Sequence, residues 1–95
     1  MKVKNVNGTS GLSCKCGSWL DHWKRHAGTS AYYCQESLCR NLAEVGAHVQ
    51  RADGSYDNSW YIVPLCHAHN QTGKSLTLMS SAVLVPARAG PTCGR

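Results

Sequence analysis

The spacing of apolar positions predicts one helix in the first third of the chain. Trp19, Leu20 and Trp23 fall on one face of a helix spanning residues 18–27, and basic residues occupy its last turn. Gly28 follows directly and provides a stop signal. We therefore expect an amphipathic helix that packs its tryptophan face against the rest of the domain.

Alternating apolar and turn-forming residues predict short strands in the second half of the chain. Residues 45–51 and 60–64 are expected to pair as a hairpin, because Asp53-Gly54 and Asp57-Asn58 between them favour turns. The other expected elements are a loose lead-in with one short strand (1–13), a strand (31–35), a short helix (66–72), a second short hairpin (76–79 with 82–85) and a tail (86–95). The predicted fold class is α+β, in a single domain spanning residues 1–95.

The composition makes a purely apolar core insufficient. The 95 residues include only 16 Leu, Ile, Val and Phe, and a chain of this size buries only about 60–65% of its unfolded surface. The same chain carries six Cys and five His. Small domains with weak cores are usually stabilised by disulfides or by metal ions.

The N-terminal sequence favours metal over disulfides. It has neither the apolar run nor the cleavage site of a signal peptide, and the longest apolar stretch is too short to span a membrane. We therefore expect a cytoplasmic protein with no membrane partner. In a reducing cytosol, cysteines favour metal ligation over disulfide formation.

The Cys and His residues fall in close pairs, which is the spacing of zinc ligands. Cys66 and His69 follow the second strand of the hairpin, on the first turn of the expected helix, where backbone N–H groups favour a thiolate. Cys34 and Cys39 are the natural second pair, because structural zinc takes four such ligands, commonly as two close pairs. These four residues form the expected first zinc site, and His67 is expected to point away from the metal.

A second group of ligands lies toward the two ends of the chain. Cys14 and Cys16 stand one residue apart, and Cys93 needs a partner because an exposed thiol near a chain end is a liability. Together with His22 they form the expected second zinc site, which gives one or two zinc ions in total. Two alternatives stay open: His26, one helical turn away, can replace His22, or Cys93 forms a disulfide with Cys14 or Cys16.

The central part of the chain resembles a known family of zinc proteins. The cysteine pair, the strand Gly46-Ala47-His48-Val49, a hairpin and Pro64-Leu65-Cys66-x-x-His69-Asn70 are similar to the treble-clef, ββα-metal arrangement of the HNH nuclease superfamily, over residues 34–74. The runs Cys16-Gly17-Ser18-Trp19 and Thr92-Cys93 are similar to segments of a group of short bacterial proteins without an established activity. The resemblance implies a fold and a zinc site.

The resemblance carries the nuclease chemistry only in part. In active HNH members the first His activates a water, and a residue after the last zinc ligand helps to hold Mg²⁺ at the scissile phosphate; His48 and Asn70 occupy these places. Ala47 precedes His48 where the family has an acid or another His, and Tyr61 stands where the family has Asn. One His and one Asn without a carboxylate are a poor site for Mg²⁺ or a similar hard cation.

The charge of the chain permits, but does not require, a nucleic-acid partner. The formal net charge is +5, and two Cys3His zinc sites would reduce it to about +3, because each adds two metal charges and three thiolates. Trp23, Lys24 and Arg25 at the end of the expected helix can stack a base and hold a phosphate. The simpler interpretation is a solvated last turn that complements the helix dipole.

The sequence therefore favours a small zinc-stabilised treble-clef module that binds nucleic acid or protein without catalysis. The alternative is an HNH-type metal-dependent endonuclease that uses His48 and Asn70. A third class, a structural protein with no ligand, predicts that no DNA or RNA binds at low salt.

Overall fold

The computed structural model describes residues 1–6, 17–54 and 57–87. These residues contain five short strands and two helices. In chain order they are β1 (Lys2–Asn5), α1 (Trp19–Ala27), β2 (Val45–Arg51), β3 (Tyr61–Leu65), α2 (His67–Asn70), β4 (Leu76–Thr77) and β5 (Val85–Pro86). The strands form one sheet of order β4-β1-β2-β3-β5, in which every neighbouring pair is antiparallel. The predicted α+β class is confirmed.

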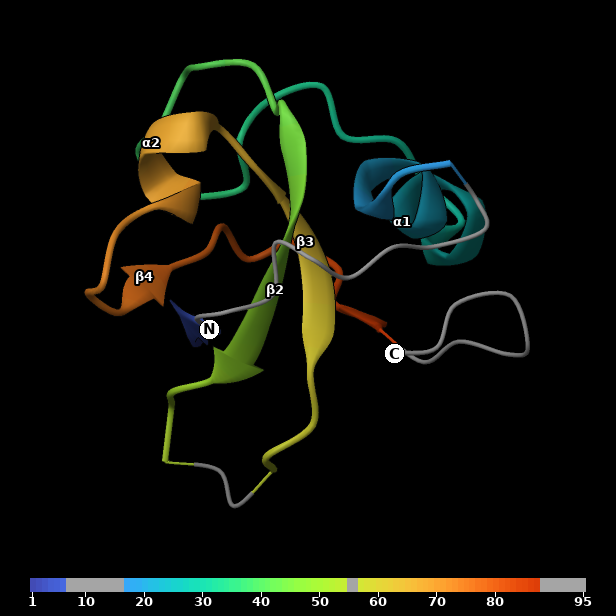
Figure 1. The fold of residues 1–95 in the computed structure, drawn as a ribbon. Coiled ribbons are helices and arrows are strands. Elements are labelled where there is room, and N and C mark those ends of the chain that lie inside the picture. The colour runs from blue at the N-terminus through green and yellow to red at the C-terminus, as the bar shows by residue number, and fades with distance from the viewer. Residues whose placement is uncertain (7–16, 55–56, 88–95) are drawn as a thin grey trace.

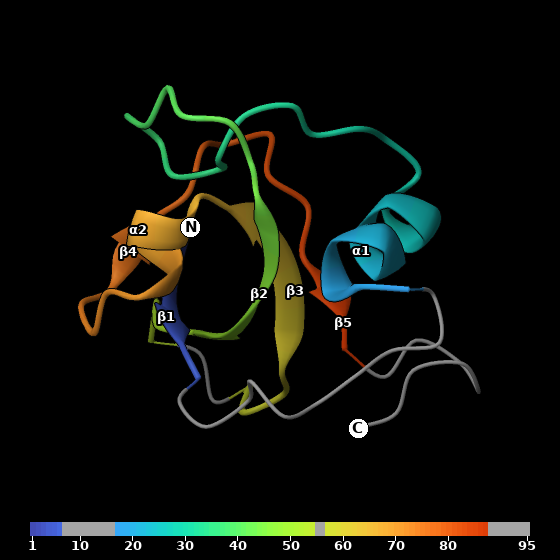
Figure 2. The same cartoon turned by 45° about the horizontal axis from the view of Figure 1, so that its top comes forward.

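The central hairpin of β2 and β3 separates two layers of the core. Ala47 pairs with Val63 and His48 pairs with Ile62, so the two pairs point to opposite faces of the sheet. Ala47 and Val63 belong to a buried cluster that includes two of the cysteines, whereas Ile62 packs with Trp23 of α1. Figures 1 and 2 accordingly show α1 and α2 on opposite sides of the hairpin.

Local signals set the bounds of α1. The Ser18 side chain accepts a hydrogen bond from the backbone N–H of Asp21, and Gly28 ends the helix in the left-handed conformation with φ of 72°. The buried Trp23 donates its indole N–H to the Val83 carbonyl at 2.8 Å, which fastens the helix to the chain entering β5. In the described ranges, no helix is both long and apolar enough to cross a membrane.

A glycine lets α1 approach the sheet closely. A Cβ atom on Gly46 of β2 would lie 2.4 Å from the carbonyl carbon of Trp19 and 2.5 Å from the backbone nitrogen of Leu20. The backbone of α1 therefore rests directly on the backbone of β2, where only a glycine fits.

The second predicted hairpin is wrong. Residues 76–79 and 82–85 do not pair with each other: β4 pairs with β1, and β5 pairs with β3, at opposite edges of the sheet. The chain after β4 is held elsewhere, because the N–H of Met79 donates to the carbonyl of Gln35. A local pattern predicts that two strands form but not which distant strands they join.

Three other expectations change in detail. The strand expected at 31–35 is reduced to an isolated bridge between Tyr33 and Leu42. The short strand expected in the lead-in exists as β1 and lies inside the sheet, with Val3 fully buried. The expected tail joins the fold further than predicted, because Pro86 belongs to β5 and the N–H of Ala87 donates to the carbonyl of Trp60.

Candidate metal centre

The loop from Cys34 to Cys39 presents the first pair of ligands and is fixed by backbone hydrogen bonds. The N–H of Cys34 donates to the carbonyl of Asn41 at 2.8 Å, which closes the base of the loop. Within the loop, Gln35 donates to the carbonyl of Pro64 in β3 at 3.0 Å. The loop is therefore positioned by the central hairpin, against the face that the hairpin turns away from α1.

Helix α2 presents the second pair. Cys66 is its N-cap, and His69 follows on the first turn. Because Cys66 makes no side-chain capping bond, the Glu44 carboxylate supplies a cap by accepting from the backbone N–H of His67 at 3.0 Å. The His67 side chain is 64% exposed beside Glu44, so it points away from the cysteines, as expected.

The structure brings the four residues of the first predicted site together. One ligand atom from each of Cys34, Cys39, Cys66 and His69 lies within 4.8 Å of all the others. The Cys39 and Cys66 sulfurs are 3.9 Å apart, and His69 Nδ1 lies 3.5 Å from the Cys34 sulfur and 3.3 Å from the Cys66 sulfur. Tetrahedral zinc with Zn–S bonds of about 2.3 Å and a Zn–N bond of about 2.0 Å requires about 3.8 Å between sulfurs and about 3.5 Å between sulfur and nitrogen. The cluster has the size and the donor set of a zinc site.

The surroundings of Cys34 and Cys66 shift the pKa values of their thiols in opposite directions. Burial raises the pKa of Cys34 to about 12. Burial also acts to raise the pKa of Cys66, but hydrogen bonds from the backbone N–H and the ring of His69 outweigh it and lower that pKa to about 7. Cys66 is thus prepared to bind as a thiolate, whereas metal binding must displace a proton from Cys34.

Asn41, which is not one of the predicted ligands, places hydrogen-bond donors near two of the sulfurs. The backbone N–H of Asn41 donates to the Cys39 sulfur at 3.4 Å, and its side-chain nitrogen lies 4.0 Å from the Cys66 sulfur. Such donors stabilise thiolates around a bound metal. The sequence held no signal for this role, since Asn41 stands outside the Cys and His spacing.

Asn5 is a second contributor that the sequence did not indicate. Its side-chain nitrogen donates to the carbonyl of His69 at 2.9 Å and to the carbonyl of Thr72 at 3.0 Å. These carbonyls belong to α2 and the chain just beyond it, so one amide ties β1 to the helix that carries two of the ligands. Asn5 is therefore a positioning residue for His69.

We expect Asn5→Ala to weaken zinc binding about tenfold or more, because the outer partners of metal ligands commonly contribute 10- to 100-fold in affinity. Competition with a chromophoric chelator measures the change. Asn5→Asp should behave similarly, since a carboxylate cannot donate to the two carbonyls. The exposed neighbour Lys4→Ala is the control, and equal affinity in all four proteins would contradict the positioning role.

Most of the second predicted site lies outside the described residues. This applies to Cys14, Cys16 and Cys93, and equally to the alternative disulfide. His22 is fully buried in α1, and its Nε2 donates to the carbonyl of Pro86 at 2.9 Å. His26 packs beside it, with ring centroids 4.7 Å apart.

The two residues of the possible nuclease site do not converge. His48 points to the face of the sheet that α1 covers, and its ring lies 4.4 Å from the ring of Trp19. Asn70 belongs to α2, on the opposite side of the central hairpin (Figures 1 and 2). His48 is 5% exposed, and its Nε2 is buried without a hydrogen-bond partner. Burial, with a smaller effect from the charge of His22, lowers the pKa of His48 to about 4.

The pKa of His48 predicts acid sensitivity. The unfolded chain binds a proton at this residue near pH 6.5, whereas the folded chain binds it only near pH 4. Between these values the unfolded state holds more protons, so the free energy of unfolding falls as the pH falls, by up to about 3 kcal/mol. Denaturant unfolding of the wild type and of His48→Leu between pH 7 and pH 4 measures this loss of unfolding free energy. The wild type should lose more stability than the variant, and parallel pH profiles would contradict this origin.

The expected nucleic-acid-binding residues separate into buried and exposed ones. Trp23 is 1% exposed and holds Val83, so its ring is not available to stack on a base from solvent. Lys24 and Arg25 are exposed in the last turn of α1.

Comparisons of the chain with protein-family models, with curated proteins and with solved structures gave no match. The described residues thus define a small α+β domain with a Cys3His group able to hold a metal ion such as zinc. The similarity to the HNH superfamily rests on the residues named in the sequence analysis alone.

Proposed function

We propose that the chain is a zinc-stabilised treble-clef module that binds a nucleic-acid or protein partner and catalyses no reaction. The observation that carries the proposal is the cluster of Cys34, Cys39, Cys66 and His69, which supplies all four ligands of a tetrahedral zinc ion. Catalytic zinc keeps one position for water or substrate, whereas structural zinc is closed by four protein ligands. Zinc bound here would cross-link the loop to α2.

The order of the elements supports the treble-clef part of the proposal. A loop with two Cys ligands comes first, the hairpin β2–β3 follows, and a helix with the remaining two ligands comes directly after it. This is the order that the resemblance to HNH proteins implies. Zinc would then link the loop to α2, next to the buried cluster that both share with the hairpin.

Two observations favour binding over nuclease activity. His48 faces α1, whereas Asn70 belongs to α2 on the other side of the hairpin. The Nε2 atom of His48 is buried, so it is closed to water and phosphate. A general base must come within hydrogen-bond reach of the proton that it removes. The surface near the zinc loop instead exposes large apolar side chains, namely Tyr32, Tyr33, Leu38 and Leu42.

Incubation of supercoiled plasmid with the zinc-loaded protein and Mg²⁺, Mn²⁺ or Ni²⁺ tests the absence of catalysis. We expect the plasmid to stay intact with each of the three metal ions. A different result would favour the HNH-type nuclease over the binding module. That result is cleavage by the wild type that is lost in His48→Ala, with the zinc content unchanged.

A second zinc on Cys14, Cys16, His22 and Cys93 remains part of the proposal. What supports it is the hydrogen bond from His22 Nε2 to the Pro86 carbonyl. Metal-bound histidines commonly donate one ring nitrogen to a carbonyl in this way. Elemental analysis of Cys93→Ser should find about one zinc fewer per chain than in the wild type, and an unchanged count would remove Cys93 from the site.

A further inference from the structure

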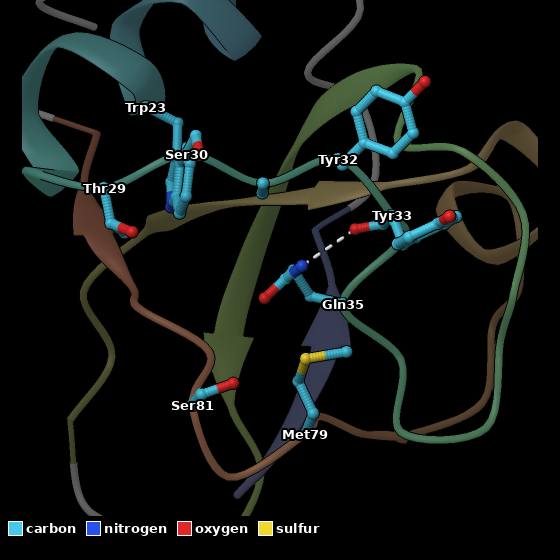
Figure 3. A pocket seen from close by; sticks show the side chains of 9 residues that line it. Trp23, Thr29, Ser30, Tyr32, Tyr33, Gln35, Met79 and Ser81 are labelled. Atoms are coloured by element: carbon cyan, nitrogen blue, oxygen red, sulfur yellow. Dashed lines mark hydrogen bonds between the residues drawn. The ribbon is translucent and has the colours of Figure 1, made fainter.

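A cavity of about 230 Å³ lies beside the loop from Cys34 to Cys39. The end of α1, the chain entering the loop and the turn after β4 surround it (Figure 3), and its walls include Trp23, Tyr32, Tyr33, Gln35, Met79 and Ser81. It belongs to neither predicted metal site. The lining includes the exposed residues Tyr32 and Tyr33, which precede the loop.

Gln35 gives this cavity a directed polar group. The residue is only 8% exposed, and its side-chain nitrogen donates to the Tyr33 carbonyl at 2.8 Å. That bond fixes the orientation of the amide, so the oxygen points away from Tyr33 and into the space between Trp23, Ser81 and Met79 (Figure 3). The cavity thus presents a fixed hydrogen-bond acceptor in its wall.

The remaining lining is neutral. Thr29, Ser30 and Ser81 contribute hydroxyl groups, and Met79 and the aromatic rings contribute apolar surface. The lining includes no carboxylate, Lys or Arg, so a phosphate or a metal ion would find no counter-charge there. The chemistry fits an uncharged group with an N–H edge and apolar faces.

Two exposed tyrosines line the cavity, and two exposed basic residues lie nearby in the chain. Tyr32 is 72% and Tyr33 is 50% exposed, and their rings meet edge to face at 5.1 Å. Lys24 and Arg25, both exposed, stand in the last turn of α1 just before the residues that form the rim. Aromatic side chains that stack bases, next to cations that hold phosphates, are the usual elements of single-strand recognition.

We propose that this cavity binds an unpaired base of a single-stranded nucleic acid, with Gln35 accepting a hydrogen bond from the base and Tyr32 stacking at the entrance. The inference rests on the proposed binding role and names its partner. Adenine, cytosine and guanine fit the acceptor best, because each carries an exocyclic amino group, whereas thymine offers only a ring N–H. Trp23 would form the buried wall.

Fluorescence anisotropy with labelled oligodeoxyadenylate, oligodeoxycytidylate and oligothymidylate of about 12 nucleotides tests the proposal. We expect binding at low salt, with oligothymidylate the weakest. Tyr32→Ala should weaken binding of the adenylate at least fivefold, which is the lower end of what one stacked base contributes. Leu38→Ala is the matched control, because Leu38 is 87% exposed on the loop that follows Tyr32 but lies outside the cavity lining.

The outcomes separate the proposed base-binding cavity from the proposed zinc-stabilised module. A zinc-loaded, folded protein that binds none of the three strands would overturn the base site and leave the zinc module standing. Equal losses in Tyr32→Ala and Leu38→Ala would show that the strand contacts the loop without using the cavity. Retained affinity in Tyr32→Ala would exclude stacking at the entrance.

Discussion

Cys66→Ser should leave the chain largely unfolded. Cys66 is 2% exposed, it occupies the N-cap position of α2, and its sulfur lies within reach of the other three ligands. Structural zinc contributes on the order of 10 kcal/mol of apparent free energy, which is comparable to the whole stability of a small domain. Circular dichroism should therefore show no cooperative melting transition near neutral pH, and elemental analysis should find the zinc of this site lost.

His67→Ala is the matched control for Cys66→Ser. His67 lies in the same helix, next to Cys66, but its side chain is exposed and faces Glu44. This variant should keep the zinc content and most of the melting temperature of the wild type. A Cys66→Ser protein that melts like His67→Ala would show that the cysteines are ordinary buried thiols.

Gly46→Ala should separate α1 from the sheet. The new methyl carbon would lie 2.4 Å from one backbone atom of Trp19, and neither backbone can move aside without disturbing the helix or the central hairpin. Overpacking against rigid backbone is at the severe end of core substitutions, so we expect a loss of at least about 3 kcal/mol. For a domain of this size that corresponds to a decrease in melting temperature of about 12 °C or more.

The location of the damage distinguishes this effect from a general loss of stability. Gly46 faces α1, whereas the proposed zinc ligands lie on the other face of the sheet. Gly46→Ala should therefore increase the solvent exposure of Trp23, seen as red-shifted tryptophan fluorescence, before zinc is lost. Gly73→Ala is the control, because no atom lies within 4 Å of its added carbon. Equal melting temperatures for the two variants would contradict the close approach of α1.

Much of the fold follows from local sequence signals. Ser18 and Gly28 bound α1 as their capping preferences predict, and the turn residues after Arg51 correctly placed the hairpin β2–β3. Leu76 and Val85 show where this reasoning fails. Each begins a two-residue strand, and the partner of each strand is decided by contacts far away in the chain.

Some residues of the candidate site could also be predicted from the sequence, and others could not. Cys34, Cys39, Cys66 and His69 could be selected from the sequence, because ligand type and spacing are local properties of the chain. Asn5 could not, since its hydrogen bonds reach residues 64 and 67 positions away. The side of the sheet on which His48 packs was equally hidden, because the face on which it points depends on the register of the sheet.

X-ray absorption at the zinc edge, on protein purified without added metal, tests the central claim most directly. Both proposed sites have three sulfur ligands and one nitrogen ligand, so the expected spectrum is the same for one zinc or two. The account predicts zinc bound by three sulfurs at about 2.3 Å and one nitrogen at about 2.0 Å. Folded protein without zinc, or zinc surrounded only by oxygen and nitrogen, would contradict it.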